Sequence, residues 1–114
     1  MSLFKPIMDK KKLALYDKII KKCPEVEREG KVTPYATANG YMFTLINKSD
    51  ELGIRFSEEV QKKYIKVLKT STFKSYGSIL TGYVLIPDSI WKDVEALTKY
   101  IREGYDFAMS LKPE

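Results

Sequence analysis

The fold is decided by residues 32–47, which read VTPYATANGYMFTLIN and contain no charged side chain. Asn39-Gly40 lies in the middle of this stretch. Asn-Gly favours a two-residue β-hairpin connection, because both central positions of a type I′ turn need positive φ. We therefore expect strands at residues 32–38 and 41–46.

The two strands differ in expected position. In residues 41–46 both alternating sets are largely apolar, which is typical of a central strand covered on both faces. In residues 32–38 Pro34 cannot donate a ladder hydrogen bond, which favours the edge of the sheet.

The segments around this hairpin predict further elements. A helix is expected over residues 9–23, because Leu13, Tyr16, Ile19, Ile20 and Cys23 form one apolar stripe before Pro24. A third strand over 52–56 would turn Leu52, Ile54 and Phe56 inward and Gly53 and Arg55 toward water. Ser57 is the expected N-cap of a helix that ends near residue 69, with Val60, Tyr64, Val67 and Leu68 on its apolar stripe.

The second charge-free stretch, residues 75–87, predicts two strands, at 76–80 and 83–86, with a turn at Thr81-Gly82. A long helix follows, from Asp88 or Asp93 almost to Pro113, with Gly104 as its weak point. The expected order is αβββαββα. It indicates a single α+β domain over residues 1–114, with a two-layer architecture: a mainly antiparallel sheet and flanking helices.

Composition restricts the chemistry. The chain has 114 residues, 44% of them hydrophobic, which is enough for one core. It contains no histidine and one cysteine, so an internal disulfide and a zinc site made of cysteines are both excluded. With no apolar run of signal or membrane-spanning length, we expect a cytoplasmic protein without membrane contact, metal or cofactor.

Three patterns that could indicate an enzyme have simpler explanations. Ser71-Thr72-Phe73-Lys74 matches the Ser-x-x-Lys pattern of penicillin-binding enzymes, but the companion elements are imperfect and in the wrong order. Gly77 and Gly82 have the spacing of a phosphate loop, but no Lys-Ser/Thr follows, so both are expected in turns. Cys23 lies on the buried stripe and is expected to be inert. The sequence therefore predicts a protein that is not an enzyme.

The middle of the chain resembles the N-terminal domain of the TfoX/Sxy competence regulators, over about residues 12–111. The resemblance rests on three segments: Asn39-Gly40-Tyr41-Met42-Phe43, Leu52-Gly53-Ile54-Arg55-Phe56 and Tyr83-Val84-Leu85-Ile86-Pro87. It implies a two-layer α/β domain associated with regulation and protein contacts, without catalytic residues. Where better-known members have Met-Phe-Gly-Gly, this chain has Thr33-Pro34-Tyr35-Ala36-Thr37. It also stops before their second domain, so we do not expect a competence-activator role.

Two binding hypotheses follow. The first is protein association, with itself or with a regulator, through strand addition at the edge expected for residues 32–38 and through a surface that includes Tyr35, Asn39 and Tyr41. The alternative is nucleic-acid binding by the basic N-terminal helix, since residues 1–31 hold nine basic and five acidic side chains. Its expected phosphate contacts are Lys10, Lys11, Lys12, Lys18, Lys21 and Lys22.

Overall fold

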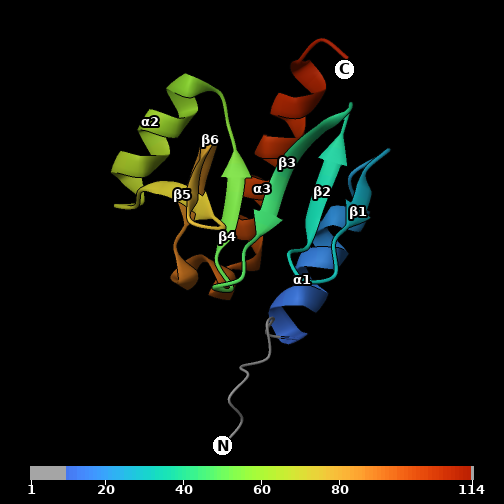
Figure 1. Ribbon diagram of the computed structural model, residues 1–114, viewed down its shortest axis with the longest axis horizontal. Coiled ribbons are helices and arrows are strands. Elements are labelled where there is room, and N and C mark those ends of the chain that lie inside the picture. Colours follow the sequence, from blue (N-terminus) through green and yellow to red (C-terminus); the bar gives the residue numbers. More distant parts are fainter. Residues whose placement is uncertain (1–9, 114) are drawn as a thin grey trace, which may run out of the picture.

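Between residues 10 and 113 the protein has an α+β fold in which three α-helices cover one antiparallel sheet (Figure 1). The computed structural model describes residues 10–113. Its helices are α1 (Lys10–Lys21), α2 (Glu58–Val67) and α3 (Val94–Ser110), with a short 3-10 helix, η1 (Asp88–Lys92). The strands are β1 (Glu27–Glu29), β2 (Tyr35–Ala38), β3 (Tyr41–Ile46), β4 (Leu52–Arg55), β5 (Thr72–Ser75) and β6 (Ser78–Ile86). The predicted fold class is confirmed, and the element order gains one strand, β1. The two strands expected at residues 76–80 and 83–86 both fall largely within β6, and β5 precedes them.

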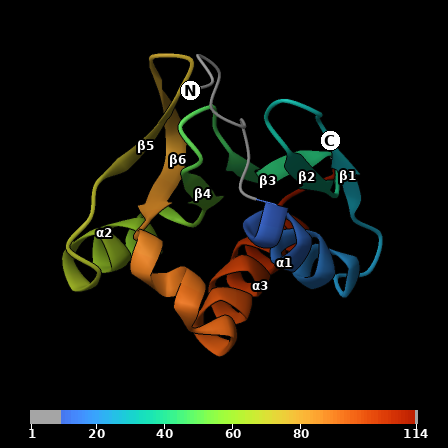
Figure 2. The ribbon, with the colours of Figure 1, turned by 90° about the horizontal axis from the view of Figure 1, so that it is seen from below.

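The sheet has the order β1-β2-β3-β4-β6-β5, and every neighbouring pair is antiparallel. The three helices lie on one side of it, whereas the β5–β6 hairpin rises on the other side (Figure 2). The main core lies between the sheet and the helices. Its fully buried side chains include Tyr16, Phe43, Ile54, Leu97 and Ile101.

The first hairpin forms as predicted. Asn39 and Gly40 have φ values of 58° and 84°, and Ala38 pairs with Tyr41 across them. The register between the two strands then shifts by one residue. Ala36 pairs with Thr44, but Thr37 pairs with Met42, so Phe43 of β3 is an extra residue and forms a β-bulge. The bulge allows two consecutive residues, Phe43 and Thr44, to face the helices. The ring centroid of Phe43 is 5.9 Å from that of Tyr105, and the Thr44 hydroxyl accepts a hydrogen bond from the Tyr16 hydroxyl.

The edge position predicted for residues 32–38 is wrong. β2 begins after Pro34 and pairs on both sides, with β3 and with β1. Pro34 itself only accepts a hydrogen bond, from the Ile46 amide at 2.8 Å, so its missing N–H does not interrupt the ladder. The edge strand is β1, whose residues Glu-Arg-Glu we expected to be a solvated connector.

The second hairpin also differs from the prediction. The turn lies at Tyr76-Gly77, with φ values of 53° and 77°, and not at Thr81-Gly82. Gly82 lies inside β6 with a φ of 94°, where the register with β5 jumps from Thr72–Val84 to Lys74–Ile79. A residue with positive φ within a strand bends that strand. Because β6 bends at Gly82, the β5–β6 hairpin lies over the outer face of the sheet.

That hairpin covers the sheet face that we expected to meet water. Phe73 of β5 is fully buried over Gly53 of β4, and a Cβ at Gly53 would overlap its ring. Leu45, Phe73 and Tyr83 form a second, smaller core there. Asn47 holds the hairpin in place by donating to the Lys74 carbonyl at 2.7 Å.

The two later helices begin at side-chain caps. Ser57 accepts a hydrogen bond from the Val60 amide, as predicted, and Asp93 accepts one from the Ala96 amide at the start of α3. Val67, which we placed on the apolar stripe of α2, is 63% exposed. Gly104 is buried where α3 lies close against Ile54 and Arg55 of β4.

Candidate functional site

The solvent side of α1 carries a cluster of lysines. At 100° per residue, Lys10, Lys11, Lys18, Lys21 and Lys22 fall within an arc of about 120°, and all five are exposed. We call this arc the lysine face. It runs about 18 Å along the helix and lies opposite the buried stripe of Tyr16, Ile19 and Ile20.

Lys12, the sixth lysine predicted as a phosphate contact, lies elsewhere. Its ammonium group is 2.7 Å from the Asp88 carboxylate and 3.9 Å from that of Asp50, and it lies over the Trp91 ring. Its side chain is only 19% exposed. The structure therefore separates Lys12 from the lysine face and gives it an internal role: it joins α1 to η1 and to the β3–β4 turn.

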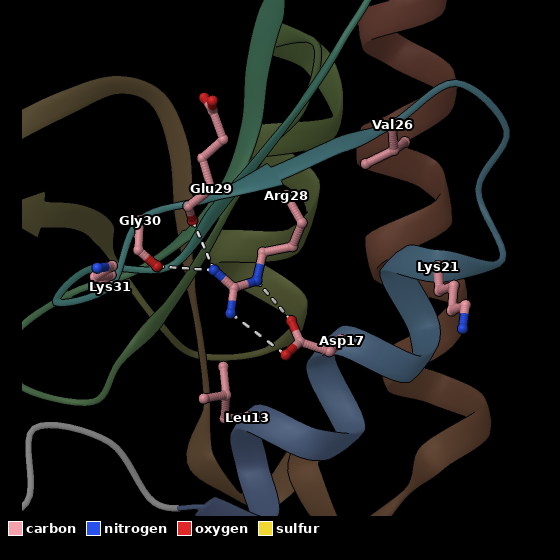
Figure 3. A pocket seen from close by; sticks show the side chains of 8 residues that line it. All are labelled: Leu13, Asp17, Lys21, Val26, Arg28, Glu29, Gly30 and Lys31. Atoms are coloured by element: carbon pink, nitrogen blue, oxygen red, sulfur yellow. Dashed lines mark hydrogen bonds and ion pairs between the residues drawn. The ribbon is translucent and has the colours of Figure 1, made fainter.

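A groove of about 780 Å³ adjoins the lysine face, between α1 and β1 (Figure 3). Leu13 and Val26 contribute apolar surface, and Lys21 belongs both to this α1–β1 groove and to the lysine face. The complete lining is Leu13, Asp17, Lys21, Val26, Arg28, Glu29, Gly30 and Lys31.

Arg28 holds the two walls of the groove together. Its guanidinium donates to both carboxylate oxygens of Asp17, at 2.6 and 3.3 Å, and to the backbone carbonyls of Glu29 and Gly30 (Figure 3). The hydrogen bond to Asp17 raises the pKa of Arg28. Charge-assisted bidentate pairs fix geometry well, so the wall of the groove is built from satisfied groups.

The β1 side of the groove carries the cations Arg28 and Lys31, whereas the Glu29 side chain points away from α1 (Figure 3). Glu29 accepts a hydrogen bond from the Tyr35 hydroxyl at 3.0 Å, and this contact with a carboxylate raises the pKa of Tyr35. Glu25 and Glu27 are exposed nearby in the sequence. A ligand in the groove would therefore meet Lys21 on α1 and Lys31 on the β1 side, while Arg28 is already paired with Asp17.

The predicted interaction residues Tyr35, Asn39 and Tyr41 have internal partners. The Asn39 amide donates to the carbonyls of Ala108 and Leu111, and the Tyr41 hydroxyl donates to that of Lys112. Asn39 and Tyr41 thus anchor the end of α3 against the first hairpin. The Tyr35 hydroxyl donates to Glu29, and its ring packs against the second core on the outer sheet face, so Tyr35 does not line the α1–β1 groove.

Strand addition would use β1 or β5, the edges of the sheet, in place of residues 32–38. β1 has three residues, and the guanidinium of Arg28 already donates to the carbonyls of Glu29, the last of them, and of Gly30. Short strands and charged side chains are common means of blocking an edge.

Other candidate residues have structural surroundings. Cys23 is 5% exposed, and burial raises the pKa of its thiol. The Ser71 hydroxyl donates to the Thr72 carbonyl on the surface. Between residues 10 and 113 we find no group of three or more acidic or cysteine side chains that could hold a metal ion, and no helix long and apolar enough to cross a membrane.

Sequence reasoning missed the groove because Glu27-Arg28-Glu29 has no apolar residue to indicate a strand. The one available signal was an arginine, rare in this lysine-rich chain, between two glutamates. Comparison with models of protein families finds no match, and no curated protein matches the chain.

Proposed function

We propose that this chain is a non-enzymatic regulatory or protein-interaction domain of the TfoX N-terminal type, which binds an acidic segment of a partner protein on the lysine face and in the α1–β1 groove. One observation carries the proposal: five exposed lysines share one arc of α1 beside a groove with apolar and charged walls. The sequence resemblance supports the domain type, since that family is associated with regulation and protein contacts.

The start of α1 supports a binding role for the lysine face. The first turn contains Lys10, Lys11 and Lys12 and no acidic residue. Positive charge at this end opposes the helix macrodipole, which favours carboxylates there. A local arrangement that lowers helix stability is expected where a surface serves a ligand.

A protein partner fits the groove better than a nucleic acid does. Leu13 and Val26 offer apolar contact, which the side chains of a peptide can use and a sugar-phosphate backbone cannot. Protein interfaces combine an apolar centre with a polar rim, and the groove with the lysine face beside it has this composition.

The test compares two matched charge reversals in pull-downs from the native cell. K18E/K21E/K22E changes the lysine face, and K62E/K63E/K66E makes the same charge change on exposed lysines of α2. We expect a protein partner that survives nuclease treatment of the lysate, binds the wild type and the α2 variant, and is lost with the α1 variant. Equal binding by both variants would contradict the proposal.

Nucleic-acid binding by the same lysine face is the second candidate, because five ammonium groups spaced over about 18 Å could each meet a phosphate. If all five did so, log K would fall with log salt, with a slope no steeper than about −4.5 for duplex DNA and about −3.5 for a single strand. Fluorescence anisotropy with short DNA and RNA at several salt concentrations measures this slope. A binding signal that is absent or insensitive to salt would exclude this candidate.

A further inference from the structure

Arg55 differs from the other two arginines of the chain. Arg28 is paired with Asp17, and Arg102 lies 3.7 Å from the Asp106 carboxylate. Arg55, the last residue of β4, is half-buried, and its guanidinium makes no hydrogen bond or ion pair to any residue between 10 and 113. Its guanidinium donors therefore lack protein acceptors in the described structure.

The position of Arg55 is nevertheless well defined by its packing. Its guanidinium carbon is 5.6 Å from the ring centroids of both Tyr41 and Phe107. Its aliphatic stem lies along β6 at Gly82, where a Cβ would come within 3.4 Å of the Arg55 Cγ. Strands β3, β4 and β6 and helix α3 thus all contribute to holding one cation.

The aromatic contacts satisfy only part of what this group requires. Ring faces attract the positive charge, but a guanidinium also has five N–H donors in a planar fork. None of the Arg55 nitrogens is among the buried polar atoms without a partner, so the fork reaches solvent and is open to a ligand. The fork matches the two oxygens of a carboxylate, and arginine stacked on aromatic rings is a common way to present it.

We propose that Arg55, flanked by Tyr41 and Phe107, is a recognition site for a carboxylate. The ligand is either a free dicarboxylic acid or an acidic side chain of a peptide segment. The site is distinct from the lysine face and does not depend on the function proposed for it.

The chain's three arginines make a direct test practical, because each gives one Nε–Hε signal in a proton–nitrogen NMR spectrum. The titrants are glutarate, an acetylated hexaglutamate amide, the matching hexaglutamine peptide and inorganic phosphate, each at low salt. We expect the Arg55 signal to shift with a carboxylate titrant while that of Arg28 stays in place. A shift with glutarate identifies a site open to free acids, and a shift with hexaglutamate alone identifies a peptide site.

Variants connect the shift to the fork. R55K keeps the charge and should weaken binding about tenfold, since it loses bidentate hydrogen bonds to a charged acceptor. R55M keeps the stem and should abolish binding of glutarate at this site. In both variants, the backbone amide signals of Tyr41 and Gly82 replace the missing Arg55 signal as the measure of binding. R102M is the matched control, because Arg102 also lies over a tyrosine ring, Tyr105, at 5.3 Å; it should bind like the wild type.

The wild-type titration by itself can overturn the proposal, whatever the stability of the variants. An Arg55 signal that does not move with either carboxylate titrant would do so. So would an equal shift with hexaglutamine, or tighter binding of phosphate than of glutarate.

Discussion

Replacing Gly104 by alanine tests the packing of α3 on the sheet, because two effects of opposite sign meet at this position. In an exposed helix interior, glycine to alanine stabilises a protein by about 1 kcal/mol. Gly104 is buried, and an added Cβ would lie 2.5 Å from the Ile54 Cγ2 and 3.2 Å from the Arg55 carbonyl oxygen. The second neighbour is backbone in a central strand, so it cannot rotate away.

The steric effect should exceed the gain in helix propensity. Inserting a methyl group into a well-packed core costs about 1–3 kcal/mol, and the upper end applies when a neighbour is main chain. Subtracting about 1 kcal/mol for propensity leaves a destabilisation of about 2 kcal/mol. For 114 residues the entropy of unfolding is about 0.24 kcal/mol/K, so Tm should fall by about 8 °C.

Urea unfolding followed by circular dichroism and by the fluorescence of Trp91, the chain's one tryptophan, measures this change. The m-value should stay constant, because the unfolded chain exposes nearly the same surface. A variant more stable than the wild type would refute the close approach of α3 to β4.

Three further predictions concern single side chains. N39A should lower the free energy of unfolding by about 2 kcal/mol. It removes two hydrogen bonds to the end of α3, and it places alanine at a φ of 58°, which is unfavourable for alanine. N39G removes the same hydrogen bonds but tolerates that φ, so the same denaturation assay separates the two causes. Burial raises the pKa of Tyr16 and of Tyr83, so the unfolded chain loses these protons first. The resulting stability is complete below about pH 10 and falls above it by about 1.4 kcal/mol per pH unit for each tyrosine. Melting curves up to about pH 11 measure this, and Y16F should have the shallower slope. Cys23 should react with a maleimide slowly in the native state and quickly in urea, since burial and a raised pKa both suppress its thiolate; equal rates would contradict its buried position.

The candidate site was only partly predictable. The lysines of α1 follow from the sequence, and helical geometry alone separates Lys12 from the other five. The groove beside them could not be foreseen, because it needs β1, which has no apolar alternation and forms by pairing with β2 and through the contacts of Arg28. We expected Asn39 and Tyr41 to form an interaction surface, but both donate to carbonyls at the end of α3. That segment lies about 70 residues further along the chain, so no local pattern reveals the contact.

Local signals determined the α+β class, the three helices, the first hairpin and the Ser57 cap, since each depends on residues close together in the chain. Asn39-Gly40 needs positive φ wherever it occurs, and an apolar stripe predicts a buried helix face without reference to its partner. These features are properties of the sequence itself.

The tertiary structure decided the order of the strands, the burial of the outer sheet face and the surroundings of Arg55. Each results from β1 at the edge or from the bend of β6 at Gly82, which brings Phe73 over Gly53 and leaves the Arg55 stem on β6. The contacts of the hairpin join distant residues, such as Phe73 with Gly53 and Arg55 with Gly82, and their free energy depends on which surfaces meet. A sequence pattern within a short window therefore does not predict which surfaces of the chain come into contact.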